Sequence, residues 1–320
     1  MKRFLKIFCI WSAIGILLAI SLDLMISSGL RKLDQRKYST WNDIYKGGLK
    51  SDVVILGSSR TWCGYNTYII DSMLNCNSYN LGIDGHQIDF QIIRYETYAR
   101  YNTKPQTILV NTEFLSTLSI AADKPYEREQ FFPYFFDDIL IDAVSSAKRI
   151  TIFDRYLPLF RYYGYREEFE NGMASFFGKK DFVDGGMYKG YRGNEYGWDR
   201  GSLSRDTLFT ANVDWKAVEL LDSFARGSIK DGQNVVFVKS PVYFPLREKF
   251  VNIEQSDSIF EAISKKYDIP ILDYYFSTVC MDSTNFYNPG HLNKKGSELF
   301  TIELCKDLDS LGIIRHNKSL

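Results

Sequence analysis

The chain has 320 residues, enough for one large domain or two small ones with a full buried core. Its 39 basic and 39 acidic residues give a net charge of zero, which argues against a nucleic-acid-binding protein. Aromatic residues make up 16% of the chain, a composition that suits a sugar-binding surface as well as a plain core.

The first thirty residues predict a membrane-spanning helix. Three basic residues precede an apolar run over residues 7–22, which resumes after Asp23. About 20 apolar residues span a bilayer, so the run is long enough if Asp23 lies near an interface. A cleaved signal peptide is the alternative, but no small-x-small cleavage site follows the run. We therefore expect an uncleaved single-pass anchor over residues 1–28 and a connector over residues 29–50.

The charge pattern leaves the orientation of this span open, because basic residues flank both of its ends. A short inner tail with a large outer domain is the ordinary arrangement for one amino-terminal span. We therefore expect the main domain outside the cytoplasm, on the periplasmic or cell-surface side.

Short apolar runs alternate with helical segments along the rest of the chain. The predicted strands cover residues 53–56, 77–82, 107–111, 234–240 and 270–273. The predicted helices cover residues 67–74, 89–101, 215–229, 248–267 and 292–311. This alternation indicates βαβ connections, and therefore an α/β fold with a parallel sheet.

The alternation breaks at about residues 121–205, where the chain is rich in aromatic residues and Gly. We interpret this stretch as an insertion in a domain of residues 51–320, partly helical over 137–176. Insertions of this length are usually functional or disordered, and the aromatic residues argue against disorder. The aromatic runs at 131–136 and 188–196 predict a cap that stacks on sugar rings. A lid that only covers core is an equally good interpretation.

A serine motif, Gly57-Ser58-Ser59, follows the first predicted strand. A Gly after a buried strand permits a sharp turn at the carboxyl edge of the sheet, where ligands bind in α/β folds. A Ser there can be a nucleophile if a His reaches it, although Ser58 and Ser59 can also simply cap the next helix. The late motif Asn288-Pro-Gly-His291, just before the last predicted helix, supplies such a His.

Together these motifs resemble the SGNH/GDSL hydrolase superfamily, over about residues 50–115 and 230–310. The resemblance implies a three-layer, flavodoxin-like fold with a five-stranded parallel sheet. The family nucleophile stands third in Gly-Asp-Ser, which implies Ser59 here. The second family block, Asn-x-x-x-x-Gly, is matched by Asn80-Leu-Gly-Ile-Asp-Gly85. This match implies that the Gly85 and Ser59 amides form an oxyanion hole.

Two family blocks are matched only in part. Gly-x-Asn-Asp is replaced by Asn111-Thr-Glu-Phe114, which makes Asn111 the candidate for a further oxyanion donor. In the last block, His291 fits the base, but Asn288 stands where the family has Asp. An Asn can hold an imidazole in one tautomer but adds no charge, so Asp282 is the reserve candidate for this role. The candidate substrate-binding residues are Arg60, His86 and Glu113.

The amino-terminal span and the Ser in the Asp position are similar to the membrane-anchored acyl-transfer branch of the superfamily. The D-alanyl transfer protein of teichoic acid synthesis and the alginate O-acetylation proteins belong to that branch. The resemblance implies a serine-dependent O-acyltransferase or esterase, acting without a cofactor on a cell-surface or exported polysaccharide. Its partners would be that glycan acceptor and a multi-spanning membrane O-acyltransferase. The alternative is a non-catalytic SGNH-fold protein for glycan binding or assembly.

The cysteines give no framework for the fold. Four of the five lie outside the predicted anchor, and their spacing does not decide whether they pair. The sequence has no CxxC motif and no Cys/His cluster, so it predicts no metal site.

Overall fold

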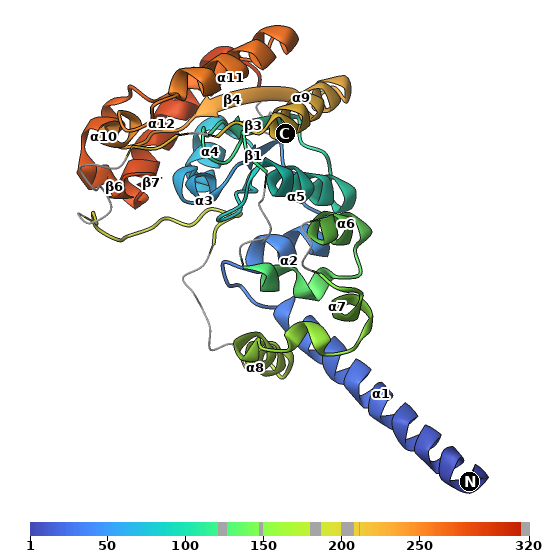
Figure 1. The fold of residues 1–320 in the computed structure, drawn as a ribbon. Helices are drawn as coiled ribbons and strands as arrows, with labels where there is room; N and C mark the ends of the chain where they lie inside the picture. Colours follow the sequence, from blue (N-terminus) through green and yellow to red (C-terminus); the bar gives the residue numbers. More distant parts are fainter. Residues whose placement is uncertain (121–126, 147–149, 180–186, 200–207, 211, 315–320) are drawn as a thin grey trace, which may run out of the picture. The chain divides into compact units, whose positions relative to one another are not determined.

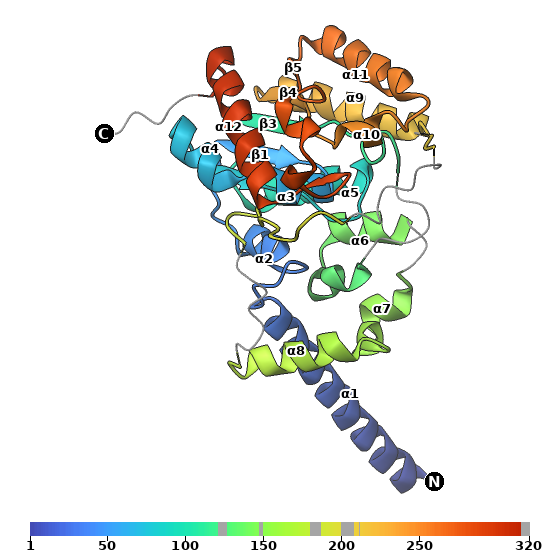
Figure 2. The same ribbon diagram turned by 90° about the vertical axis from the view of Figure 1, so that its left-hand side faces the viewer.

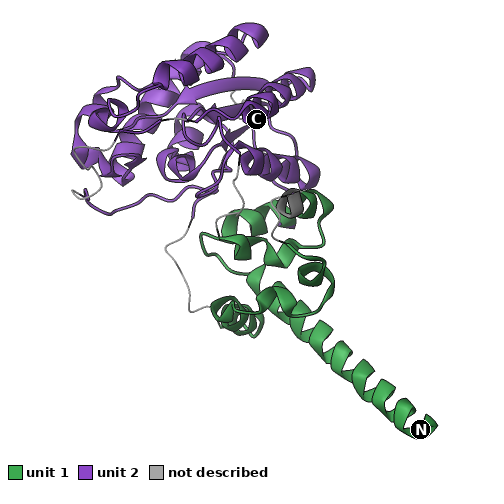
Figure 3. Cartoon of the chain, viewed as in Figure 1, with its two compact units in different colours: residues 1–45, 122–186 green, residues 46–121, 187–320 purple. Residues whose placement is uncertain are grey.

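The computed structural model describes residues 1–120, 127–146, 150–179, 187–199, 208–210 and 212–314. The chain forms two compact units, coloured separately in Figure 3. Unit 1 contains Met1–Tyr45 and Ala122–Gly186, and unit 2 contains Lys46–Ala121 and Met187–Leu320. The first part of the predicted insertion therefore folds with the amino-terminal helix, whereas its last part folds with the sheet.

Unit 2 is built on a five-stranded parallel sheet of order β2-β1-β3-β4-β5. Its strands are β1 (Val53–Leu56), β2 (Ser78–Asn80), β3 (Thr107–Asn111), β4 (Asn234–Lys239) and β5 (Ile271–Asp273). In the register, Val53 of β1 pairs with Ser78 of β2 on one side and with Thr107 of the central strand β3 on the other. This is the flavodoxin-like order, with its topological switch point between β1 and β3. The predicted fold class is confirmed.

Helices cover both faces of this sheet (Figures 1 and 2). They are α3 (Ser59–Gly64), α4 (Thr67–Leu74), α5 (Ile88–Tyr101), α9 (Trp215–Lys230), α10 (Phe244–Arg247), α11 (Ile253–Tyr267) and α12 (Lys294–Leu311). Helix α12 packs on α3 and α4, while α9 packs on α5 and α11. Alternate β1 residues Val53 and Ile55 are fully buried in the core that also holds Phe300 and Leu304 of α12. This alternation is what a strand with a helix on each face requires.

Two predicted helices start later in the structure than in the sequence pattern. The helix predicted from residue 248 begins only at Ile253, after its N-cap Asn252, and Glu248 instead ends the separate short helix α10. The last helix begins at Lys294, where Asn293 caps it by accepting a hydrogen bond from the Gly296 N–H at 3.0 Å. The residues before it form a short antiparallel hairpin, β6 (Phe286–Asn288) and β7 (His291–Leu292), which follows the turns η4 (Thr278–Met281) and η5 (Ser283–Asn285).

Unit 1 joins the amino-terminal segment to helices of the insertion. Its elements are α1 (Lys2–Leu30), α2 (Ser39–Lys46), η1 (Arg128–Tyr134), α6 (Asp138–Ser146), α7 (Ile152–Tyr156), η2 (Phe160–Tyr162) and α8 (Arg166–Phe176). Phe131, Phe132 and Phe135 are completely buried in this unit, and Phe131 lies edge-on to Trp41. The prediction that this aromatic run stacks on sugar rings is wrong for these three side chains, because they build the core of unit 1.

The end of α1 packs tightly against α8 at a pair of glycines (Figure 2). A Cβ atom on Gly29 would lie 1.7 Å from the Gly172 carbonyl oxygen. A Cβ atom on Gly172 would lie 2.7 Å from the Ile26 carbonyl oxygen. Since real Cβ atoms do not approach so closely, both positions require glycine for this contact.

The rest of α1 is long and apolar enough to cross a membrane, with a mean hydropathy of 2.2 over its most apolar window. Its large side chains from Phe4 to Ile20 are exposed. Asp23, the residue that interrupts the apolar run, is buried and forms an ion pair with Arg161. All five cysteines are free thiols, including Cys9 on the exposed part of α1.

Candidate active site

The turn after β1 positions two serines differently. Gly57 has φ of +155°, and a Cβ atom there would lie 1.9 Å from the Thr61 Oγ1, so only glycine fits the turn. Ser58 is the N-cap of α3 and accepts a hydrogen bond from the Arg60 N–H at 3.3 Å. Ser59 is the first residue of α3, and its side chain is not used for capping. Each of the two interpretations of the motif therefore fits one serine.

The hairpin β6–β7 brings His291 to Ser59 from 232 residues away. The Ser59 Oγ and the His291 Nε2 are 2.8 Å apart. The His291 Nδ1 lies 2.8 Å from the Asn288 Oδ1, because the two residues are paired across the hairpin. The structure thus places the three predicted catalytic residues in one line of hydrogen bonds.

The amide of Asn288 fixes which imidazole nitrogen carries the proton. Its Oδ1 also accepts a hydrogen bond from the Gly290 N–H at 3.0 Å, which identifies the atom facing His291 as oxygen. An oxygen at this position requires a proton on the His291 Nδ1. The Nε2 is then an acceptor for the Ser59 hydroxyl, which is the tautomer that a general base needs.

The surroundings of His291 keep its imidazole neutral. Burial, with a further contribution from the positive charge of Arg60, lowers the pKa of His291 to about 4. The Tyr287 ring stacks on the imidazole with its centroid 5.3 Å away. A neutral imidazole can accept the serine proton at pH 7, but the imidazolium that results has no carboxylate to stabilise it.

Glu113 is the centre of the network beneath the serine turn. Its carboxylate is buried and accepts hydrogen bonds from the Ser58 Oγ at 2.7 Å, the Asn111 Nδ2 at 2.7 Å and the Ser116 Oγ at 3.0 Å. The Asn111 Oδ1 in turn accepts from the Tyr65 hydroxyl at 2.8 Å. Through these bonds, both residues hold the serine turn in place. Glu113 was predicted to bind substrate, and Asn111 was predicted as an oxyanion donor.

Arg60, another predicted substrate-binding residue, links the ends of two strands. Its Nη2 donates to the Ser240 carbonyl oxygen at 2.8 Å, the Ser240 Oγ at 3.0 Å and the Pro241 carbonyl oxygen at 3.3 Å. Ser240 and Pro241 directly follow β4. The guanidinium therefore fixes the carboxyl edge of the sheet and brings a positive charge toward His291.

The loop after β2 carries the predicted oxyanion residue Gly85. Asn80 ties this loop to α3, because its amide donates to the Thr61 carbonyl oxygen at 2.8 Å and accepts from the Gly82 N–H at 2.9 Å. The Ile83 N–H donates to the Gly57 carbonyl oxygen at 3.0 Å, so the loop runs directly beside the serine turn. As the first residue of α3, Ser59 also presents an N–H without a partner inside the helix.

His86 lies in the same loop and is 1% exposed. Its Nδ1 lies 2.6 Å from the Asp84 carbonyl oxygen, and its ring is edge-on to Phe90. Burial lowers the pKa of His86 to about 4. The structure therefore places this predicted substrate-binding residue inside the fold, where it packs the loop.

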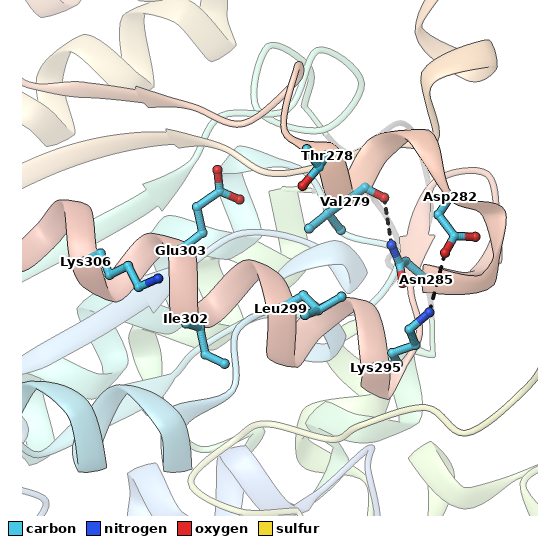
Figure 4. A pocket seen from close by; sticks show the side chains of 9 residues that line it. All are labelled: Thr278, Val279, Asp282, Asn285, Lys295, Leu299, Ile302, Glu303 and Lys306. Carbon is cyan, nitrogen blue, oxygen red and sulfur yellow. Dashed lines mark hydrogen bonds and ion pairs between the residues drawn. The ribbon is translucent and has the colours of Figure 1, made fainter.

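Asp282, the reserve candidate, lies at a different place in unit 2. Its carboxylate accepts hydrogen bonds from the Thr284 N–H at 2.8 Å and the Thr284 hydroxyl at 2.7 Å. Figure 4 shows it beside Lys295 at the rim of a surface pocket of about 350 Å³, which Glu303 also lines. These bonds give Asp282 a capping role in the turn before β6, while Asn288 holds His291.

The end of the insertion runs beside the hairpin that carries His291. The Asp199 N–H donates to the Tyr287 carbonyl oxygen at 2.9 Å, and the Arg192 N–H donates to the Trp62 carbonyl oxygen at 3.1 Å. Tyr191 is buried against α12, with its hydroxyl 2.6 Å from the Ser297 Oγ, whereas Tyr196 is 73% exposed. This stretch therefore offers an exposed aromatic ring in the segment next to the candidate site.

Sequence reasoning missed the supporting residues Tyr65, Ser240 and Tyr287. Ser240 and Tyr287 have a detectable signal, since one follows a predicted strand and the other stands beside the Asn288 motif. Tyr65 has none, because its contact with Asn111 depends on how α3 crosses the end of β3.

Comparisons with known proteins give only distant matches. No family model and no curated protein matches the chain. It is similar to the crystal structure of a "putative acylhydrolase" from Bacteroides fragilis, with 12% identity and a TM-score of 0.40, over 85% of this chain and 92% of that one. It is also similar to a "GDSL-like lipase" from Bacteroides thetaiotaomicron, with 12% identity and a TM-score of 0.36, over 81% and 88%. The chemistry of this site therefore rests on its own geometry.

Proposed function

We propose that the protein is a serine-dependent acyl-transfer enzyme of the SGNH type. The observation that carries this proposal is the 2.8 Å contact between the Ser59 Oγ and the His291 Nε2, made at the carboxyl edge of the sheet. The tautomer set by Asn288 supports it, because it leaves the Nε2 ready to accept a proton.

The first half of the reaction forms an acyl-enzyme. The Ser59 Oγ attacks the carbonyl carbon of an acyl ester while its proton passes to the His291 Nε2. The carbonyl oxygen becomes an oxyanion, which the amides of Ser59 and Gly85 stabilise. When the intermediate collapses, the carbon–oxygen bond to the alcohol breaks, and His291 returns the proton to that alcohol.

The second half uses the same groups. An acceptor hydroxyl gives its proton to His291, attacks the acyl carbon, and releases the Ser59 Oγ, which takes the proton back. If the acceptor is a sugar hydroxyl the enzyme is an O-acyltransferase, and if it is water the enzyme is an esterase. We propose a cell-surface or exported polysaccharide as the acceptor, for which the exposed ring of Tyr196 offers a stacking surface.

We also propose that α1 anchors the enzyme in a membrane, with the main domain on the outer side. The length and hydropathy of α1 support the span. As its partner we propose a multi-spanning membrane O-acyltransferase that delivers the acyl group, as the family resemblance implies.

One observation favours the second candidate, a non-catalytic SGNH-fold protein for glycan binding or assembly. The His291 Nδ1 has an amide oxygen rather than a carboxylate as its partner, so its imidazolium is poorly stabilised. In this case Ser59 and His291 would contribute to packing alone.

A fluorophosphonate probe distinguishes the two functions, because it reacts only with an activated serine. We expect the full chain to be labelled and Ser59→Ala to abolish the labelling. Ser58→Ala is the matched control: it removes a donor from the buried Glu113 and costs about 1–3 kcal/mol of stability, but the folded protein keeps the nucleophile. A full chain that resists the probe while it remains folded would reject the enzyme. Labelling that is lost only in Ser58→Ala would show that Ser58, and not Ser59, is the nucleophile.

A further inference from the structure

Unit 1 carries a cluster of exposed apolar side chains on α7, η2 and the adjoining turns. We call this cluster the apolar foot. It consists of Ile152, Phe153, Tyr156, Leu157, Phe160 and Tyr163, which are between 41% and 86% exposed. The rings of Phe153 and Phe160 lie 5.8 Å apart, so α7 and η2 contribute to one surface. Six large apolar side chains exposed within twelve residues form a patch that needs a partner.

The apolar foot is fixed to α1 at one level of that helix. The Leu159 N–H donates to the Asp23 Oδ2 at 2.8 Å, and Arg161 forms an ion pair with the same carboxylate. The Tyr162 hydroxyl lies 2.8 Å from the Ser27 Oγ. Figures 1 and 2 both show this part of unit 1 against the carboxyl-terminal part of α1.

The strained backbone of the turn indicates that this contact is specific. Leu159 has φ of +67°, a left-handed conformation that is uncommon for a residue with a Cβ atom. It is the residue whose N–H reaches Asp23. The turn therefore keeps an unfavourable conformation at the point where it contacts α1.

The position of Asp23 on α1 gives the depth of the apolar foot. Phe4 and Asp23 are separated by about 28 Å along an α-helix, close to the thickness of the hydrocarbon core of a bilayer. The large side chains of α1 in this interval are exposed, and burial in unit 1 begins at Asp23. If α1 spans a bilayer, Asp23 and the turn bonded to it lie where the hydrocarbon meets the headgroups.

The charged residues of the segment that carries the apolar foot are those expected at the boundary between hydrocarbon and headgroups. Between Thr151 and Tyr163 the only carboxylate is Asp154, which is 4% exposed and paired with Arg128. The cations of the segment lie over aromatic rings, Arg155 over Tyr156 and Arg161 over Tyr162. Each is also paired with a carboxylate outside the segment, Arg155 with the exposed Asp138 and Arg161 with the buried Asp23. Apolar and aromatic side chains with arginines, and without exposed carboxylates, are the composition of a surface at a membrane interface.

We propose that the apolar foot lies in the headgroup region of the bilayer, in the leaflet from which α1 emerges into unit 1. The partner is the lipid surface itself. This inference rests on the proposed membrane anchor but not on the serine chemistry. It gives unit 1 a second attachment to the membrane, which fixes the tilt and the height of the unit as well as tethering it.

The test uses the full chain in nanodiscs of phosphatidylethanolamine and phosphatidylglycerol. A small fraction of the lipid carries a diazirine near its acyl carbonyl, and the adducts are mapped by mass spectrometry after irradiation. We expect adducts on α1 and on the apolar foot. Tyr68 and Phe276 of unit 2 are the matched controls, since they are 64% and 63% exposed. Their adduct yield should be several-fold lower than that of the apolar foot.

The variant Phe160→Glu places a carboxylate in the middle of the apolar foot. We expect a several-fold loss of adducts on the apolar foot, because a charged side chain disfavours contact with the boundary between headgroups and acyl chains. The adducts on α1 should be unchanged. Unchanged adducts on the apolar foot would overturn the proposal.

The remaining outcomes distinguish failure of the lipid contact from failure of the proposed membrane anchor and of the proposed enzyme. Adducts on α1 without adducts on the apolar foot would leave the anchor standing and reject the lipid contact, as expected if a membrane protein covers the patch. No adducts on α1 would reject the anchor and the apolar foot together. Equal labelling of Tyr68 and Phe276 would mean that adducts follow exposure alone, which also rejects the proposal. None of these results affects the fluorophosphonate test.

Discussion

Replacing Asn288 by Asp tests how His291 is held. The new carboxylate oxygen would take the place of the Asn288 Oδ1, 2.8 Å from the His291 Nδ1. It could still accept the Gly290 N–H, so the hairpin should keep its geometry. An opposite charge at this distance raises a histidine pKa by about 1–3 units. The pKa of His291 should therefore rise from about 4 to roughly 5–7.

The same shift gives the expected gain in rate. Each pKa unit corresponds to about 1.4 kcal/mol, so the imidazolium formed in the transition state gains about 1.4–4 kcal/mol of stabilisation. Only part of this charge is developed in the transition state, and we expect a rise of roughly tenfold in kcat/KM at alkaline pH. The gain is smaller than the loss of about ten-thousandfold when a serine protease exchanges its Asp for Asn, because here the tautomer is already correct.

The assay is the hydrolysis of 4-nitrophenyl acetate by the full chain in detergent, followed from about pH 3 to about pH 9. Neutral His291 is the active form, so activity falls as the pH drops through its pKa. The acid limb should move upward by about 1–3 pH units in Asn288→Asp. Asp282→Asn removes an exposed carboxylate elsewhere and should leave the limb in place. An unmoved limb in Asn288→Asp, or a moved limb in Asp282→Asn, would refute the reasoning.

Three further predictions address the support of the site and the anchor. Arg60→Gln should raise the pKa of His291 by less than Asn288→Asp does, because burial is the larger cause of its low value; an acid limb that moves down would contradict this. Gly172→Ala should cost about 1–3 kcal/mol and lower the Tm of unit 1, since its Cβ meets the backbone of α1, whereas Gly15→Ala, with no atom within 4 Å, should not. A reporter enzyme fused after Leu320 should be active only outside the cytoplasm, and activity inside would exclude an exported acceptor.

The fold of unit 2 could be predicted from the sequence because its signals are local. The run over residues 53–56 is apolar and ends at Gly57, and β1 has those bounds. α4 and β3 also have their predicted bounds, since Asn66 caps the helical segment and Asn111 ends the apolar run of the strand. Local patterns such as these fix the order of strands, and the order limits the topology.

The roles within the site depend on contacts between distant segments, which local patterns do not carry. Asn288 could be predicted to replace an Asp, but its orientation depends on the Gly290 N–H in the folded hairpin. Asn111 is the last residue of β3 and Glu113 follows that strand, as a donor or a substrate contact would. Their actual partners, Ser58 and Tyr65, stand at the two ends of α3 and were not predictable from spacing.

Unit 1 was the hardest part to predict, because it is assembled from two segments far apart in the chain. The aromatic run over residues 131–136 has the composition of a binding surface, yet it packs on Trp41 of the connector. No local pattern links the two segments. Complementary charges do join them, among them Asp23 with Arg161 and Lys37 with Glu129, but their sequence separation hides the pairing.

The pairing of Asp23 with Arg161 also sets an order of events during synthesis. Asp23 and Arg161 are 138 residues apart, so at about 5–20 residues per second the aspartate is made roughly seven to thirty seconds before its partner. A carboxylate is costly to place in hydrocarbon, so if α1 spans a membrane, Asp23 should keep that end of the helix near the aqueous boundary until Arg161 is made. α1 can adopt its final packing only when α8 has been made, because Gly29 packs against Gly172 of that helix. If α1 spans a membrane, it is therefore inserted first and packs against the rest of unit 1 later, after the downstream residues of that unit have been made.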